Sequence, residues 1–172
     1  IIDSSNYMIF ERIYGSSSCP NGKVWATANM KDAAYNNAWS TFKPTIDKAN
    51  AFIITKMTNG AGVIIFVDTV LVDMYDNRTY PGGMSASLAP SLIAAYSWFV
   101  YHQEYAQVIQ RQVSAYYPVT EILNQLALKV NGNAYAYDAA MYSGSSYNVY
   151  AILAAFGIVT EDCLMANYRS LQ

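Results

Sequence analysis

His102 is the single histidine of the chain and therefore the first side chain to consider for acid–base chemistry. Glu104 lies two positions later, and residues two apart on a helix point to different faces, so the two cannot pair within one helix. No serine is flanked by the residues of a nucleophile elbow. We interpret His102 as structural. The least favoured of three functional hypotheses is an enzyme that uses Asp68, Asp73 or Glu104 with His102.

Acidic side chains are densest where Asp68, Asp73 and Asp76 precede Asn77. Their oxygens are the ligands that calcium takes, but the closing glutamate of an EF-hand loop is missing. We favour the interpretation that they mark the end of an element before a turn, with a weak cation site as the alternative. The four glutamates are scattered singly, without the Glu-x-x-His motif of di-iron proteins. The sequence thus predicts no catalytic residue, metal or cofactor.

Tyrosine is the most unusual component of the chain. There are 16 tyrosines against 10 lysines and arginines, and only 13% of the residues are charged, where a typical soluble domain has about 25%. Tyrosine combines an apolar ring with a polar hydroxyl and is enriched where protein surfaces meet. This composition favours a protein that assembles through neutral contacts.

Three of the tyrosines fall on one predicted helical stripe. Tyr101, Tyr105, Ile109, Gln112 and Tyr116 follow one another at spacings of four, four, three and four, which places them on one face of a helix. Core packing and a contact face are equally good interpretations of this stripe. We therefore keep its three tyrosines as interface candidates.

A second group of tyrosines lies in a stretch rich in glycine and serine, between residues 134 and 150. It lacks helical periodicity and is typical of a loop with one short helix near residues 138–142. Exposed tyrosines in a loop are the better interface candidates. The candidates of this group are Tyr135, Tyr137, Tyr142, Tyr147 and Tyr150.

The charge balance excludes some classes of partner. The formal net charge is −2 and the sequence pI is about 5.2, so there is no basic footprint for nucleic acid. A chain with little net charge also tends to associate. The most apolar windows, 88–101 and 147–159, are shorter than the ~20 residues that span a bilayer. We therefore predict no nucleic-acid contact and no membrane span.

Periodicity predicts a mainly α protein with a single domain over residues 1–172. Residues 29–172 should form a bundle of five to seven helices. Residues 1–28 are expected to form an extended arm or a small hairpin, from the alternating runs 7–14 and 23–28.

In the first half of the bundle, Asn29 is predicted to cap a helix, with Asp32 three residues on, and Pro44 to interrupt it. A second helix should follow Pro44 and stop at the glycine-rich stretch 59–62. The next run, 63–75, is dense in β-branched residues, and its period does not separate a buried strand from a buried helix.

In the second half, the longest helix should be capped by Ser85 or Ser87 and run to about Tyr116. Pro118 is expected to start a further short helix that ends at the Asn-Gly pair 131–132. Two helices should follow: one capped by Ser146, running through Phe156 and ended by Gly157, and a last one that starts at Thr160.

Two further features leave alternatives open. Cys19 and Cys163 either pair, which would tie the N-terminal loop to the last helix, or remain two separate thiols. The chain opens at Ile1 rather than at methionine, which indicates processing or a start inside a longer product.

Composition therefore favours a non-enzymatic structural subunit of a repeating assembly, such as a virion coat or connector, or an extracellular filament. Its partners would be copies of itself or other subunits, and its location extracellular or in a virion. The alternative is a helical binding module for a small apolar or carbohydrate ligand, with tyrosines lining the site.

Overall fold

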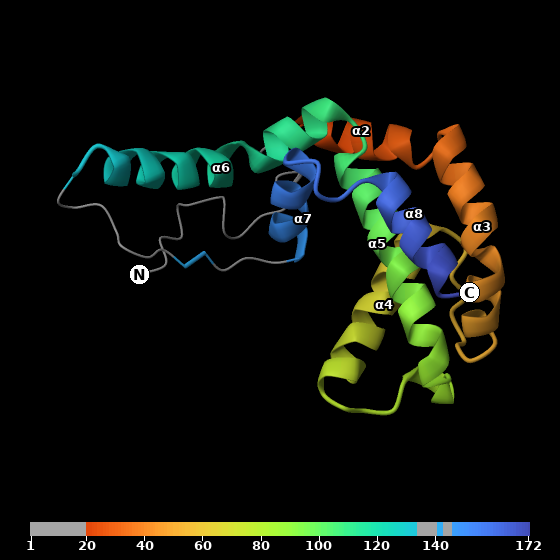
Figure 1. The fold of residues 1–172 in the computed structure, drawn as a ribbon. Helices are drawn as coiled ribbons and strands as arrows, with labels where there is room; N and C mark the ends of the chain where they lie inside the picture. The colour runs from red at the N-terminus through yellow and green to blue at the C-terminus, as the bar shows by residue number, and fades with distance from the viewer. Residues whose placement is uncertain (1–19, 134–140, 143–145) are drawn as a thin grey trace. The chain divides into compact units, whose positions relative to one another are not determined.

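A computed structural model describes residues 20–133, 141–142 and 146–172 of the chain. The described residues form seven α-helices and two short 3-10 helices, with no strand among them, which confirms the prediction of a mainly α fold. The helices are shown in Figure 1 and are α2 (Pro20–Asn29), α3 (Ala33–Asn50), α4 (Gly60–Tyr75), η1 (Pro81–Gly83), η2 (Ala86–Leu88), α5 (Ala89–Tyr105), α6 (Val108–Val130), α7 (Ser146–Ala155) and α8 (Glu161–Ser170).

The chain divides into two compact units. Unit 1 takes Glu104–Val159 with the residues up to Trp25, and unit 2 takes Ala26–Gln103 with Thr160–Gln172. Unit 1 therefore contains α6 and α7, and unit 2 contains α3, α4, most of α5, and α8. The expectation that residues 1–172 form one domain stays a prediction.

The predicted extended run 23–28 is wrong, because these residues lie within α2. Pro20 is the first residue of α2, where its missing N–H costs nothing and its fixed φ suits a helix. A short alternating run fits either structure, and the helix start at Pro20 decides between them. The other half of the expected hairpin, 7–14, lies outside the described residues.

Helix α3 differs from the prediction at both ends. Its N-cap is Asp32 rather than Asn29, since the Asp32 carboxylate accepts a hydrogen bond from the Tyr35 N–H. It also runs through Pro44, where a break was predicted. Phe42 and Ile46 on either side of Pro44 are fully buried, and their burial contributes about 3–6 kcal/mol, which offsets the roughly 3 kcal/mol cost of an internal proline.

The segment between α3 and α4 is a loop and not the end of a second helix as predicted. The Asn50 side chain closes this loop, because its amide donates to the Met57 carbonyl and accepts from the Met57 N–H, at 3.1 and 2.8 Å. Asn59 then caps α4, accepting from the Gly62 N–H at 2.9 Å. The run 63–75 is therefore helical, which resolves the open choice between strand and helix.

The predicted long helix is divided into two. Ser85 caps η2 rather than a long helix, α5 ends at Tyr105, and α6 begins at Val108. Helix α6 then continues through Pro118, so the predicted restart there is also wrong. Its predicted end at the Asn-Gly pair is confirmed, since Asn131 is the C-cap and the next residue, a glycine, has a φ of 69°.

The last two helices follow the prediction closely. Helix α7 begins at Ser146, and Gly157 after its end has a φ of 67°. Thr160 caps α8 by accepting a hydrogen bond from the Cys163 N–H at 3.2 Å. Cys163 is a free, exposed thiol, while Cys19 lies outside the described residues.

The core of unit 2 is aromatic and joins α3, α5 and α8. The centroid of the Phe42 ring lies 4.6 Å from that of Tyr168 and 5.3 Å from that of Phe99, and both pairs meet edge to face. The Tyr168 hydroxyl forms a hydrogen bond with the Thr45 hydroxyl, with 2.7 Å between the two oxygens.

Across the part of the chain that the structure describes, no helix combines the length and apolar character needed to cross a membrane.

Candidate functional site

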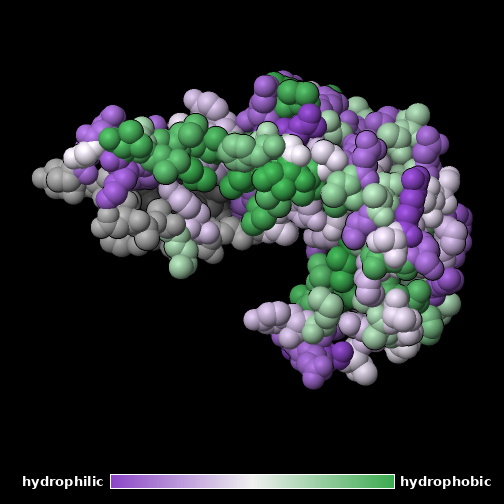
Figure 2. Space-filling model, in the orientation of Figure 1, coloured by the Kyte–Doolittle hydropathy of each residue, from purple (hydrophilic) through white to green (hydrophobic). Residues whose placement is uncertain are grey.

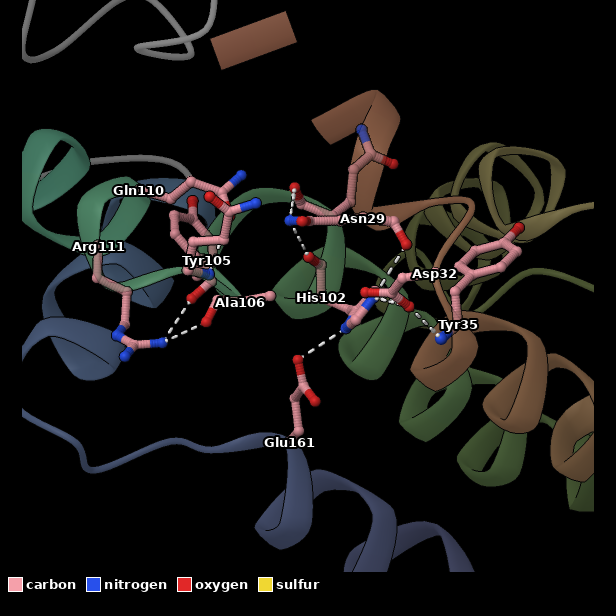
Figure 3. A network of polar contacts seen from close by, with 11 residues as sticks. Asn29, Asp32, Tyr35, His102, Tyr105, Ala106, Gln110, Arg111 and Glu161 are labelled. Atoms are coloured by element: carbon pink, nitrogen blue, oxygen red, sulfur yellow. Dashed lines mark hydrogen bonds and ion pairs between the residues drawn. The ribbon is translucent and has the colours of Figure 1, made fainter. Parts of the chain in front are cut away.

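His102 lies at the centre of a buried polar cluster in unit 2. Its side chain is 3% exposed, and both ring nitrogens have oxygen neighbours. Nδ1 lies 2.7 Å from Oε1 of Glu161, and Nε2 lies 3.1 Å from both Oδ1 of Asp32 and the Asn29 carbonyl. The two carboxylates therefore approach different nitrogens of the same ring (Figure 3).

Helix ends position the groups around His102. Glu161 is the first residue of α8, Asp32 is the N-cap of α3, and Asn29 is the last residue of α2. The buried Asn29 amide returns a hydrogen bond to the His102 carbonyl at 2.9 Å. Trp98, one turn earlier on α5, stacks on the imidazole with ring centroids 4.6 Å apart and planes 11° from parallel. The His102 side chain on α5 thus contacts the end of α2 and the starts of α3 and α8.

The partners of His102 favour its charged form. A carbonyl and ionised carboxylates only accept hydrogen bonds, so both ring nitrogens must carry a proton to donate to all three. Burial lowers the pKa of His102, but the hydrogen bond and charge of Glu161, the charge of Asp32 and the Asn29 carbonyl outweigh it and raise the pKa above its usual 6.5. The cluster is therefore a buried, charge-assisted clamp.

The geometry does not suit His102 to acid–base catalysis. Both nitrogens are engaged by the protein, and the ring is buried, so neither nitrogen is presented to a substrate. Its carboxylate partners are Asp32 and Glu161, rather than the Asp68, Asp73 or Glu104 of the enzyme hypothesis. These partners lie 70 and 59 residues away in sequence, and only their positions at helix starts hinted at a role.

The acidic residues considered for a cation site do not form one. Asp68 and Asp73 lie on α4, and Asp76 is its C-cap and forms an exposed ion pair with Arg78 at 2.8 Å. Among the residues that the structure describes, there is no group of three or more His, Cys, Asp or Glu side chains that could hold a metal.

The tyrosine candidates separate by burial. Tyr101 and Tyr105 are buried at the end of α5, whereas Tyr116 is exposed on α6, so the predicted single stripe is wrong as one helix face. Tyr142 is exposed, and Tyr147 and Tyr150 are half-buried. In unit 1 the Tyr105 hydroxyl donates to the Tyr147 carbonyl at 2.8 Å. The remaining two candidates, Tyr135 and Tyr137, lie outside the described residues.

Polar contacts fix the start of α6 in unit 1. Gln107 caps the helix, and its N–H donates to the Gln110 side chain at 3.0 Å. The Arg111 guanidinium donates to the carbonyls of Tyr105 and Ala106 at 2.9 and 2.8 Å, which satisfies acceptors at the end of α5 (Figure 3). The side of α6 that turns inward is therefore polar at its start, with Gln110 fully buried.

The outward side of α6 is apolar. Ile109, Tyr116, Leu123 and Val130 recur every seven residues and are 43%, 61%, 57% and 85% exposed. Figure 2 shows hydrophobic residues gathered along this helix. An ordinary surface helix turns its apolar stripe toward the core, so α6 has the reverse arrangement. We call its outward stripe the α6 seam, defined as Ile109, Gln112, Tyr116, Val119, Leu123, Leu126 and Val130.

Comparison with known proteins adds no relative: no family model, curated protein or solved structure matches this chain. The interpretation of the two sites therefore rests on their own geometry.

Proposed function

We propose that this chain is a non-enzymatic structural subunit of a repeating assembly, either a virion coat or connector or an extracellular filament. The observation that carries the proposal is the reversed amphipathicity of α6, whose seam is exposed except at the half-buried Val119, while Gln110 on its other side is buried. Monomeric proteins rarely expose a long contiguous apolar surface unless it binds something. The low charge of the chain adds support, because neutral surfaces associate without ionic repulsion.

A repeating assembly needs more than one contact face, and unit 2 offers a second. On α4, Ile65, Val72 and Tyr75 are exposed, and their spacing places them on one side of the helix. Asp68 lies on the same side and is also exposed. This face is more polar than the α6 seam, so we expect it to form the weaker of two contacts.

The interior of unit 2 supports a role that is not enzymatic. His102 holds helix ends through both of its nitrogens instead of facing a cavity. Its partners raise the pKa of the His102 ring and so favour its protonated form, which suits a structural role better than that of a general base.

Sedimentation velocity across a concentration series tests this proposal. Wild-type protein should form larger species as concentration rises, and Leu123→Glu should weaken this association at least tenfold because it places a charge on the exposed seam. The matched control is Asn124→Glu, which adds the same charge at the next, exposed position outside the seam. A wild-type protein that stays monomeric at every concentration would overturn the proposal.

The alternative function, a binding module for a small apolar or carbohydrate ligand, is favoured by one feature. Gln112, Val113, Tyr116 and Tyr117 line a shallow, open hollow on α6. Aromatic rings beside an amide form a platform on which a sugar can stack. A glycan array with a saturable response that Tyr117→Ala abolishes would favour this function over assembly.

A further inference from the structure

The α6 seam has the period of a coiled coil. Its residues follow one another at alternating spacings of three and four, so they occupy successive a and d positions of a heptad, with Ile109 at a and Gln112 at d. Helices with this repeat pack along one another instead of crossing once. The occupant that fits the seam is therefore another helix lying along its length.

The flanks of the seam indicate an uncharged partner. Heptad positions e and g select partners through their charges, and here they carry a single charge, Lys129. The flanking residues are Val113, Ala115, Thr120, Ile122, Ala127 and Lys129, of which Ala115 is buried within the subunit. A second copy of α6 has the same near-neutral flanks and meets no like-charge repulsion there.

Gln112 is the one amide of the seam, and its hydrogen bonds favour one partner and one orientation. When two copies of α6 lie parallel and in register, each Gln112 faces the other, and the two amides can donate to and accept from one another. In the two antiparallel registers that overlap most, Gln112 instead faces Leu123 or Val130. A buried amide without a partner costs about 1–3 kcal/mol, so the parallel arrangement is preferred.

Pro118 does not obstruct this packing. It occupies a c position of the heptad, outside the seam, and is half-buried on the other side of α6. At a rise of about 1.5 Å per residue the seam is about 32 Å long, and a helix is about 10 Å wide. A contact strip of this length and width covers less than the roughly 800 Å² per partner of a standard interface. The pair of helices should therefore dissociate on dilution and depend on other contacts in an assembly.

We infer that the α6 seam binds a second copy of this chain, with the two α6 helices parallel and in register and Gln112 paired with Gln112. This inference rests on the proposed function, since it names the partner at the contact that carries it. It makes the contact isologous, with the same residues from both copies on the pairing axis.

Disulfide trapping tests the orientation. Both native cysteines are first replaced, by Cys19→Ser and Cys163→Ser. Two single-cysteine proteins are then made in this background, one with Leu126→Cys and one with Ile109→Cys, and they carry tags of different size. The two proteins are mixed and oxidised with glutathione disulfide. A parallel pair brings each residue next to its own equivalent, within the few ångströms that a disulfide requires. Leu126→Cys should link to Leu126→Cys and Ile109→Cys to Ile109→Cys, without mixed dimers. Asn124→Cys, exposed outside the seam, is the control that should stay unlinked.

The outcomes separate the inference from the proposed function. Mixed dimers would overturn the parallel orientation. Association without any seam disulfide would overturn the seam as a self-contact, but the proposal that the chain is a subunit of an assembly would stand. Protein that neither links nor associates would overturn both. Gln112→Leu sharpens the test, because removing the amide should allow mixed dimers to reach a yield similar to that of the like pairs. Circular dichroism checks that each variant keeps its helices.

Discussion

The two units use their apolar and polar side chains in opposite ways. Unit 2 buries Phe42 and Phe99 and holds the buried His102 ring between two carboxylates, so its strongest interactions are internal. Unit 1 buries Gln110 at the start of α6 and exposes Tyr116 on the other side of that helix. Unit 2 therefore keeps its large apolar side chains inside, whereas α6 leaves apolar side chains exposed, and this exposure is the basis of the assembly that we propose.

The largest expected effect tests where stability resides. Phe42→Ala in unit 2 should lower the free energy of unfolding by about 3–5 kcal/mol, because Phe42 is fully buried. Tyr116→Ala removes a side chain of similar size from unit 1, but this side chain is exposed, so the expected loss is below about 0.5 kcal/mol. Urea denaturation of both variants at low protein concentration makes the comparison. Equal losses would mean that Tyr116 packs within the subunit and would break the contrast.

A smaller effect is expected from the clamp in unit 2. Glu161→Gln weakens the contact with His102 and should cost about 1–2 kcal/mol, since hydrogen bonds between charged groups exceed neutral ones but Glu161 is partly exposed. Asp162→Asn is the matched control, because it removes the same charge from the first turn of α8 without a bond to His102. The control should cost no more than about 0.5 kcal/mol. Similar losses of unfolding free energy in both variants would mean that Glu161 stabilises the protein only through its charge near the start of α8, and not through His102.

The clamp also predicts a dependence on pH. A pKa raised by folding adds stability that is fully present below the unfolded value near 6.5 and is lost as the pH rises through the folded value. The stability advantage of wild type over His102→Gln should therefore shrink between neutral and alkaline pH. Denaturant titrations of both proteins at several pH values measure this. An advantage that stays constant or grows with pH would show that His102 folds in its neutral form.

Local signals in the sequence predicted several helix ends correctly. Thr160 and the Asn-Gly pair after α6 act through hydrogen bonds and backbone angles within a few residues, so they are visible in a short window. Pro44 misled the prediction because the burial of Phe42 and Ile46 outweighs the local cost of proline. Helix α6 also continues through Pro118, where no fully buried side chain among the described residues accounts for it. Helix propensity describes an isolated helix, whereas the helices of this protein are also stabilised by packing against one another.

The candidate sites were less predictable, for a related reason. The partners of His102 come from residues 59 and 70 positions away, and no spacing within one helix indicates them. For α6, the apolar period was visible at Leu123 and Val130, but period does not reveal which side of a helix turns inward. The tyrosine composition led to assembly as a hypothesis, while the seam that now supports it is mainly aliphatic.

Hydroxyl-radical footprinting of the wild-type chain at increasing concentration tests the central claim most directly, because it reports the exposure of single side chains. We predict that oxidation of Tyr116 and Leu123 falls as the protein associates, while Leu128, exposed on α6 outside the seam, keeps its reactivity. Unchanged oxidation of Tyr116 and Leu123 in associated protein would contradict the claim that the α6 seam is a contact face.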